Sequence, residues 1–78
     1  MTKALVEYVT PWLVDNPDEV SVEEVEDDRG GVVIELTVDP EDVGKVIGKR
    51  GRIIRALRIL SKAAGQRSGT TVTVEVMD

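Results

Sequence analysis

The stretch that decides the fold is DPEDVGKVIGKRGRII, residues 39–54. It opens with a strong helix start, because Asp39 can cap a helix and Pro40 suits the first helical position. Acidic residues then fill the first turn, where the helix dipole favours them. Gly48 is expected to end this helix after about two turns. The apolar side of the short helix is supplied by Val43, Val46 and Ile47.

The next four residues, Gly48-Lys49-Arg50-Gly51, form what we call the glycine loop. Its two glycines let the backbone turn sharply and leave no Cβ where a ligand backbone would approach. The loop leads into a second helix, whose N-terminal amides and dipole favour an anion. Lys49 and Arg50 add two cations at the tip. The positive surface continues along the helix with Arg52 and Arg55, and an aliphatic border beside it is predicted at Ile47 and Ile54.

Other phosphate-binding loops fit these residues poorly. The run from Gly44 to Arg50 is one residue too short for a P-loop and has arginine where a serine or threonine must hold magnesium. The glycines also follow a helix rather than the strand that a dinucleotide-binding fingerprint requires. These mismatches argue against a nucleotide-hydrolysing or dinucleotide-binding role. A bare Gly-x-x-Gly also occurs as a simple turn between helices, so the loop alone leaves a structural role open.

The second helix is predicted to run from about Arg52 to Ala64, where Gly65 ends it. At about 100° per residue, one side of this helix is apolar and the opposite side is basic. Ile54 and Ile59 lie on the borders of the basic stripe, where a purely structural helix would carry polar residues. The predicted buried centre is Ile53, Leu57, Leu60 and Ala64, flanked by Ala56 and Ala63, and the basic stripe is Arg52, Arg55, Arg58 and Lys62.

Three strands are predicted from alternating apolar residues. The first begins at Val20, and Glu24-Val25 breaks its alternation, which indicates a bulge or the end of the strand. The second, Val32 to Val38, has one dry side. The third, Thr71 to Val76, turns Val72, Val74 and Val76 inward. The acidic run between the first two strands lacks calcium-loop spacing and is interpreted as a solvated hairpin loop.

The N-terminal residues, Met1 to Val14, have the apolar spacing of an amphipathic helix. At Pro11 we expect a kink, or two short turns in place of one straight helix. Tyr8 and Trp12, the only aromatic residues, are four residues apart and are predicted to pack on the core rather than to stack on bases. The segment is too short and too charged for a membrane span, and no signal-peptide cleavage site follows. The element order is helix, strand, strand, helix, helix, strand, and we expect a single α+β domain over residues 1–78 in the cytoplasm.

Composition excludes several functional classes. The 78 residues contain no cysteine and no histidine, so a disulfide framework, a thiolate or imidazole metal site and a serine–histidine nucleophile pair are all ruled out. The formal net charge of −5 argues at first against nucleic acid. However, residues 43–74 carry eight basic side chains and no acidic one, so this window is +8 and the rest of the chain is −13. Such segregation leaves an anionic ligand possible.

The sequence Val46-Ile47-Gly48-Lys49-Arg50-Gly51, set between two helices within a strand-helix-helix-strand unit, resembles the KH family of RNA-binding domains, whose signature is Val-Ile-Gly-x-x-Gly. The element order is similar to the type II KH arrangement, in which the helices pack on one face of a three-stranded sheet. The likeness extends over essentially the whole chain, including Asp15-Asn16-Pro17-Asp18-Glu19-Val20. Within the family, the chain is most similar to the small stand-alone bacterial proteins of the KhpA/YlqC type.

The resemblance implies a clamp for about four nucleotides of single-stranded RNA, with no cofactor, metal, small-molecule substrate or catalysis. The implied phosphate-holding residues are those of the glycine loop, and the implied base groove includes the outer face of the Val32 to Val38 strand. Members of this group are thought to self-associate or to pair with a larger KH-containing RNA-binding protein linked to the cell envelope. The implied RNA-binding residues are Lys45, Val46, Ile47, Gly48, Lys49, Arg50, Gly51, Arg52, Ile54, Arg55 and Arg29, the last closing the far side of the groove; the candidate dimer interface is Ile54 and Ile59.

Overall fold

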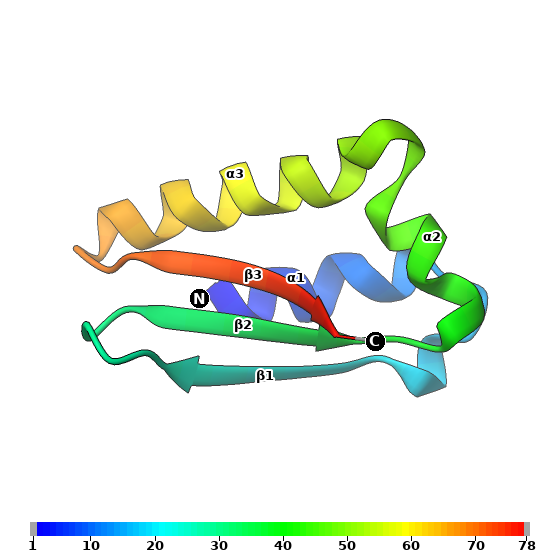
Figure 1. Cartoon of the computed structure of the whole chain (residues 1–78), viewed down its shortest axis with the longest axis horizontal. Coiled ribbons are helices and arrows are strands. Elements are labelled where there is room, and N and C mark those ends of the chain that lie inside the picture. Colours follow the sequence, from blue (N-terminus) through cyan, green and yellow to red (C-terminus); the bar gives the residue numbers. More distant parts are fainter. Residues whose placement is uncertain (1, 78) are drawn as a thin grey trace.

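The computed structural model describes residues 2–77 and contains helices packed on a three-stranded sheet (Figure 1). The expected order of helices and strands, and with it the α+β class, is confirmed. Short 3₁₀ turns occur at Thr10–Trp12, Pro17–Glu19, Pro40–Asp42 and Lys49–Gly51. The main elements are α1 (Thr2–Val9), β1 (Ser21–Glu26), β2 (Val32–Thr37), α2 (Val43–Ile47), α3 (Arg52–Arg67) and β3 (Val72–Met77).

The sheet has the order β1-β2-β3, so β2 is the central strand. A hairpin joins β1 to β2, and the two strands pair antiparallel, with Val22 opposite Leu36. β2 and β3 pair in parallel, with Ile34 opposite Val74. A parallel pair needs a long crossover connection, and here α2 and α3 supply it. α1 and α3 run in opposite directions along the sheet (Figure 1).

The core lies between the inner face of the sheet and the helices. Ile34, Leu36 and Val74 are fully buried there and share one apolar cluster with Val6 of α1 and Leu57 of α3. The alternation predicted for the second and third strands is therefore confirmed. The opposite, outer face carries one row of directly paired glutamates, Glu23, Glu35 and Glu75, one from each strand.

The predicted break in the first strand is wrong. β1 continues through Glu24 and Val25 to Glu26 and pairs residue by residue with β2. Val25 is exposed on the outer face, opposite Val33. The prediction failed because it relied on side-chain alternation alone. The backbone hydrogen bonds between β1 and β2 continue whatever the side chains of β1 contact.

The predicted kink at Pro11 is confirmed, because α1 ends at Val9 and a 3₁₀ turn follows. The prediction that the aromatic residues pack on the core is wrong: Tyr8 is 70% exposed and Trp12 is 80% exposed. Val6 and Thr10 are buried instead, and the Thr10 hydroxyl donates to the Val6 carbonyl at 2.7 Å. The side of this N-terminal segment that packs on the sheet therefore carries Val6 and Thr10, and the larger side chains of Tyr8 and Trp12 lie outside it.

The buried face of α3 also differs from the prediction. The buried residues are Ile54, Leu57, Ser61 and Gly65, whereas Leu60 is 53% exposed. Ala56 and Ala63 are exposed, and Ile53 and Ala64 are only partly buried. The physical reason is close packing: a Cβ on Gly65 would lie 2.5 Å from the Thr70 carbonyl oxygen. Small residues let α3 sit against β3, so the predicted buried centre is confirmed at Leu57 and wrong at Leu60.

The predicted end of this helix at Gly65 is wrong for the same reason. Gly65 is a packing residue inside the helix, which continues to Arg67. The chain turns only at Gly69, which has a left-handed φ of +71°. The Gly69 amide donates to the Gln66 carbonyl at 3.1 Å, and the Thr70 amide donates to the Gly65 carbonyl at 2.8 Å.

Candidate functional site

The helix start that was predicted at Asp39 is confirmed. Its Oδ1 accepts the backbone N–H of Glu41 at 2.9 Å, and Pro40 opens a 3₁₀ turn that continues into α2. α2 is only five residues long and ends at Gly48.

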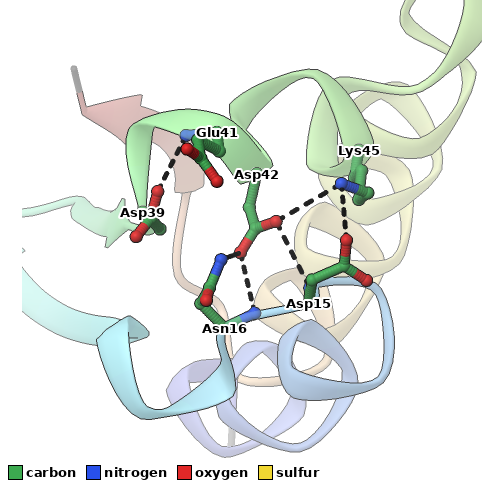
Figure 2. A network of polar contacts seen from close by, with 6 residues as sticks. All are labelled: Asp15, Asn16, Asp39, Glu41, Asp42 and Lys45. Atoms are coloured by element: carbon green, nitrogen blue, oxygen red, sulfur yellow. Dashed lines mark hydrogen bonds and ion pairs between the residues drawn. The ribbon is translucent and has the colours of Figure 1, made fainter.

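A buried carboxylate anchors this short helix (Figure 2). Asp42 is fully buried and accepts hydrogen bonds from the backbone amides of Asp15 at 3.3 Å and Asn16 at 3.0 Å, and from Asn16 Nδ2 at 3.1 Å. Burial alone would raise the pKa of Asp42, but these bonds and the charge of Lys45 hold that pKa below its ordinary value. α2 is therefore fixed to the turn that follows the N-terminal helix.

Lys45 belongs to the same network. Its Nζ lies 2.9 Å from Asp15 Oδ2 and 3.5 Å from Asp42 Oδ1. The hydrogen bond and charge of Asp15 raise the pKa of Lys45, although burial acts in the opposite direction. Two carboxylates of the protein hold this ammonium group, but the Lys45 side chain is still 46% exposed, so its contact with RNA stays a prediction. Asp42 itself was missed as an anchor because an acid in a first helical turn also suits the dipole.

The glycine loop has an unusual backbone. Gly48, Arg50 and Gly51 have left-handed φ angles of +78°, +58° and +74°. The Gly48 amide donates to the Gly44 carbonyl at 2.9 Å, and the Gly51 amide donates to the Gly48 carbonyl at 3.1 Å. A Cβ on Gly48 would lie 2.7 Å from Ile53 Cγ1, so Gly48 is required by space as well as by φ.

Cationic side chains gather around this loop. Lys49 and Arg50 are exposed at its tip, and Arg52 and Arg55 are exposed on the first turn of α3. Arg55 Nη2 donates to the Arg50 carbonyl oxygen at 2.8 Å, which ties the helix to the loop. The structure therefore brings together four of the predicted cations on one corner of the molecule.

The predicted aliphatic residues are not all accessible. Ile47 is 37% exposed beside the loop, but Val46 is fully buried and Ile54 is 7% exposed. Val46 and Ile54 turn toward the sheet and belong to the core. The prediction that Val46 and Ile54 contact bases is therefore wrong, because both side chains are part of the core beneath the loop. Ile54 is too buried to belong to the candidate dimer interface. Ile59, the other candidate interface residue, is 64% exposed.

The predicted groove wall on the second strand is wrong. β2 is central, its inner residues Ile34 and Leu36 are covered, and its outer face points away from the helices. The strand beside the helix is β3, an edge strand, where Arg58 Nε donates to the Val74 carbonyl at 3.2 Å. The Val32 amide donates to the Thr71 carbonyl, so by alternation Val72, Val74 and Val76 turn their backbone groups to the open edge.

Arg58 and Lys62 extend the basic surface along α3, and we call Arg52, Arg55, Arg58 and Lys62 the basic flank. These four residues were predicted to form one stripe, but Arg58 and Lys62 were not among the candidate RNA-binding residues; their spacing from Arg55 was the signal that could have included them. Arg29 is different: it lies in the turn between β1 and β2, at the opposite end of the molecule from α2 (Figure 1). The structure does not bring it near the glycine loop, and its role remains a prediction.

The described residues contain neither a cluster of potential metal ligands nor a helix that could cross a membrane. Within residues 2–77, no group of three or more acidic side chains is arranged to hold a metal ion. None of the helices in that range has the length and apolar character needed to cross a membrane. The exposed cations, the left-handed loop and the open strand edge are thus the site's distinctive features.

The chain matches known proteins over nearly its full length. Residues 3–76 match the family model described as KhpA/KhpB, KH domain. The chain is 50% identical over 76 residues to the "RNA-binding protein KhpA" of Aquifex aeolicus, covering 97% of this chain and 95% of that protein. It is 48% identical over 75 residues to the protein of the same name from Clostridium acetobutylicum, covering 96% of this chain and 99% of that protein. The chain therefore belongs to the KhpA/KhpB family of KH domains.

Proposed function

We propose that the chain binds single-stranded RNA through the glycine loop, without catalysis, and acts in the cytoplasm as a post-transcriptional regulator or RNA chaperone. The observation that carries the proposal is the left-handed loop that presents Lys49 and Arg50 at the start of a 16-residue helix. The RNA-binding names of the two relatives support it.

In the proposed complex, phosphates lie against the loop, the N-terminus of α3 and the basic flank. Bases extend past Ile47 toward the open edge of β3, where the Val74 carbonyl accepts from Arg58 and the backbone groups of Val72 and Val76 are turned outward. An aromatic platform is not required, since KH domains clamp the backbone of about four nucleotides. Affinity should then fall with salt at a slope of about 0.7 per neutralised phosphate.

The test is the double variant Lys49→Asp/Arg50→Asp, measured by fluorescence anisotropy with a short labelled single-stranded RNA. Binding should be lost, because two phosphate contacts become repulsive. Thermal unfolding should stay nearly unchanged, since both side chains are exposed. Unaltered affinity would refute the proposal.

The matched control is Lys3→Asp/Arg67→Asp, which makes the same change in net charge away from the loop. This control should retain most of the affinity. Equal loss in the two double variants would show that overall charge, rather than the glycine loop, determines binding.

We also propose that the chain associates with a second copy or with a larger KH-domain protein through its helical layer. The supporting observation is that Ile59 and Leu60 of α3 are exposed, as are Tyr8 and Trp12 near α1. Large apolar side chains exposed to solvent favour association. Sedimentation should show a lower mass for Ile59→Glu than for the wild type, whereas Lys62→Glu should leave the mass unchanged; no change in Ile59→Glu would remove Ile59 from any self-association.

A further inference from the structure

The glycine loop contains one conformational conflict. Arg50 has a φ of +58° and a ψ of 26°, in the left-handed region that residues with a Cβ rarely occupy. It is the only residue other than glycine with a positive φ among residues 2–77. The left-handed conformation costs an arginine free energy that glycine would not lose. Another interaction must therefore favour this loop shape.

Arg55 supplies such an interaction. Its Nη2 donates to the carbonyl oxygen of Arg50 at 2.8 Å, across the turn that the left-handed residues create. The same nitrogen lies 3.7 Å from the position that a Cβ on Gly51 would occupy, so the guanidinium packs over the loop backbone. Arg55 stands one turn into α3, a 16-residue helix, which gives the contact a rigid base.

The direction of the bond matters as much as the charge. The planar guanidinium of arginine has donors in fixed positions, whereas a lysine ammonium is a compact, strongly hydrated charge on a flexible stem. A bond to a carbonyl oxygen leaves the remaining Arg55 donors free. By contrast, Arg52 is exposed on the preceding turn and has no hydrogen bond recorded to the loop among the described residues. The two arginines therefore form a natural pair for comparison.

We propose that Arg55 is a positioning residue: it holds Arg50 in the left-handed conformation and so fixes the loop shape that presents Lys49 and Arg50 to phosphates. This inference rests on the proposed RNA-binding function for its consequence, but the loop geometry itself is testable without RNA. A role as one more phosphate-binding cation would predict no such dependence of the loop on Arg55.

The first experiment measures amide hydrogen exchange at Gly51, whose N–H donates to the Gly48 carbonyl at 3.1 Å. Arg55→Ala should speed this exchange about tenfold, the factor expected if a left-handed residue loses its support. Arg52→Ala should leave it unchanged, and thermal unfolding confirms that both variants are folded. Equal exchange rates in the two variants would overturn the inference, whatever the RNA results.

The second experiment tests rescue by glycine. In an Arg50→Gly background the left-handed conformation no longer carries a cost, so adding Arg55→Ala should change Gly51 exchange less than about twofold. A full tenfold effect in that background would show that Arg55 acts on something other than the conformation of Arg50, and would also overturn the inference.

The third experiment connects geometry to binding while keeping the charge. Arg55→Lys should weaken binding of a short single-stranded RNA by about tenfold, in step with the faster exchange, whereas Arg67→Lys, at an exposed position of α3 outside the loop and the basic flank, should weaken it less than about twofold. If both lysine variants bind as the wild type does, Arg55 contributes charge alone and the positioning role is refuted. If the wild type itself fails to bind RNA, the proposed function fails, and the two exchange experiments still decide the geometry.

Discussion

Replacing Gly65 with alanine tests how closely α3 must sit against β3. A Cβ there would lie 2.5 Å from the Thr70 carbonyl oxygen and 2.6 Å from Val72 Cγ2. The first of these atoms belongs to the backbone of the turn before β3, so rotation of a side chain does not relieve the overlap. The helix must therefore move away from the turn and from β3.

The expected loss follows from two opposing effects. Overpacking of a close contact costs roughly 1–3 kcal/mol, whereas alanine improves helix propensity over glycine by about 1 kcal/mol. Because the nearest obstacle is a backbone atom, we place the overpacking cost in the upper part of that range, at roughly 2–3 kcal/mol, and expect the free energy of unfolding to fall by roughly 1–2 kcal/mol. For a domain of this size the midpoint of thermal unfolding should drop by roughly 5–15 °C.

Gly44→Ala is the matched control, because Gly44 is also helical but a Cβ there would meet nothing within 4 Å. Only the propensity effect remains, so this variant should gain about 0.5–1 kcal/mol. The two variants and the wild type are compared by circular dichroism during heating and by urea unfolding. If Gly65→Ala is as stable as the wild type or more so, the close approach of α3 to β3 is wrong.

Four further variants extend this approach. Gly48→Ala should lower stability by roughly 1–3 kcal/mol and weaken RNA binding, because the position has a left-handed φ and faces Ile53; denaturation and anisotropy measure the two effects. Ser61→Ala should raise the free energy of unfolding by about 1 kcal/mol, since the buried Ser61 hydroxyl has no hydrogen-bond partner among the described residues; an equal or lower stability on urea unfolding contradicts this. The pKa of Asp42 is below its ordinary 3.8, so the ionised carboxylate stabilises the folded state above that pH and the benefit disappears as the pH falls through the folded pKa; thermal midpoints of Asp42→Asn should accordingly depend less on pH than those of the wild type in this acid range. Finally, replacing four acids of the first hairpin by their amides should raise non-specific RNA binding if those acids repel RNA, and unchanged binding would leave them a role in solubility only; the acids are Glu23, Glu24, Asp27 and Asp28.

Local signals predicted the part of the fold that contains the candidate site. Asp39 and Pro40 specify a helix start by capping chemistry, and Gly48 ends the short helix, all within a few residues of one another. The alternation of the second and third strands also predicted their buried faces. These predictions succeeded because each rests on a residue's own backbone preferences or on simple periodicity.

The errors concern which side of a helix meets the sheet. Tyr8, Trp12 and Leu60 are the large apolar residues that the sequence favoured for burial, yet all three are exposed. Small residues such as Ser61 and Gly65 occupy the contact instead, because the distance between α3 and β3 leaves no room for larger ones. Packing distance is a property of two elements together, and periodicity within one element does not reveal it.

The candidate site also contains some features that could be predicted from the sequence and others that could not. The glycine loop and its cations could be predicted because they are contiguous in the sequence. The anchoring of α2 by Asp42 could not, since its partners Asp15 and Asn16 are 27 and 26 residues away. The open edge of β3 likewise depends on the order of strands in the sheet, which determined that β2 is covered on both edges.

The row of glutamates on the outer face of the sheet limits how copies of this domain can associate. Glu23, Glu35 and Glu75 are directly paired neighbours, and like charges placed opposite one another in a sheet are destabilising. Two copies meeting sheet to sheet would bring both rows of carboxylates into one layer from which water is excluded, at a large electrostatic cost. The outer face of the sheet therefore disfavours stacking of two copies through their sheets.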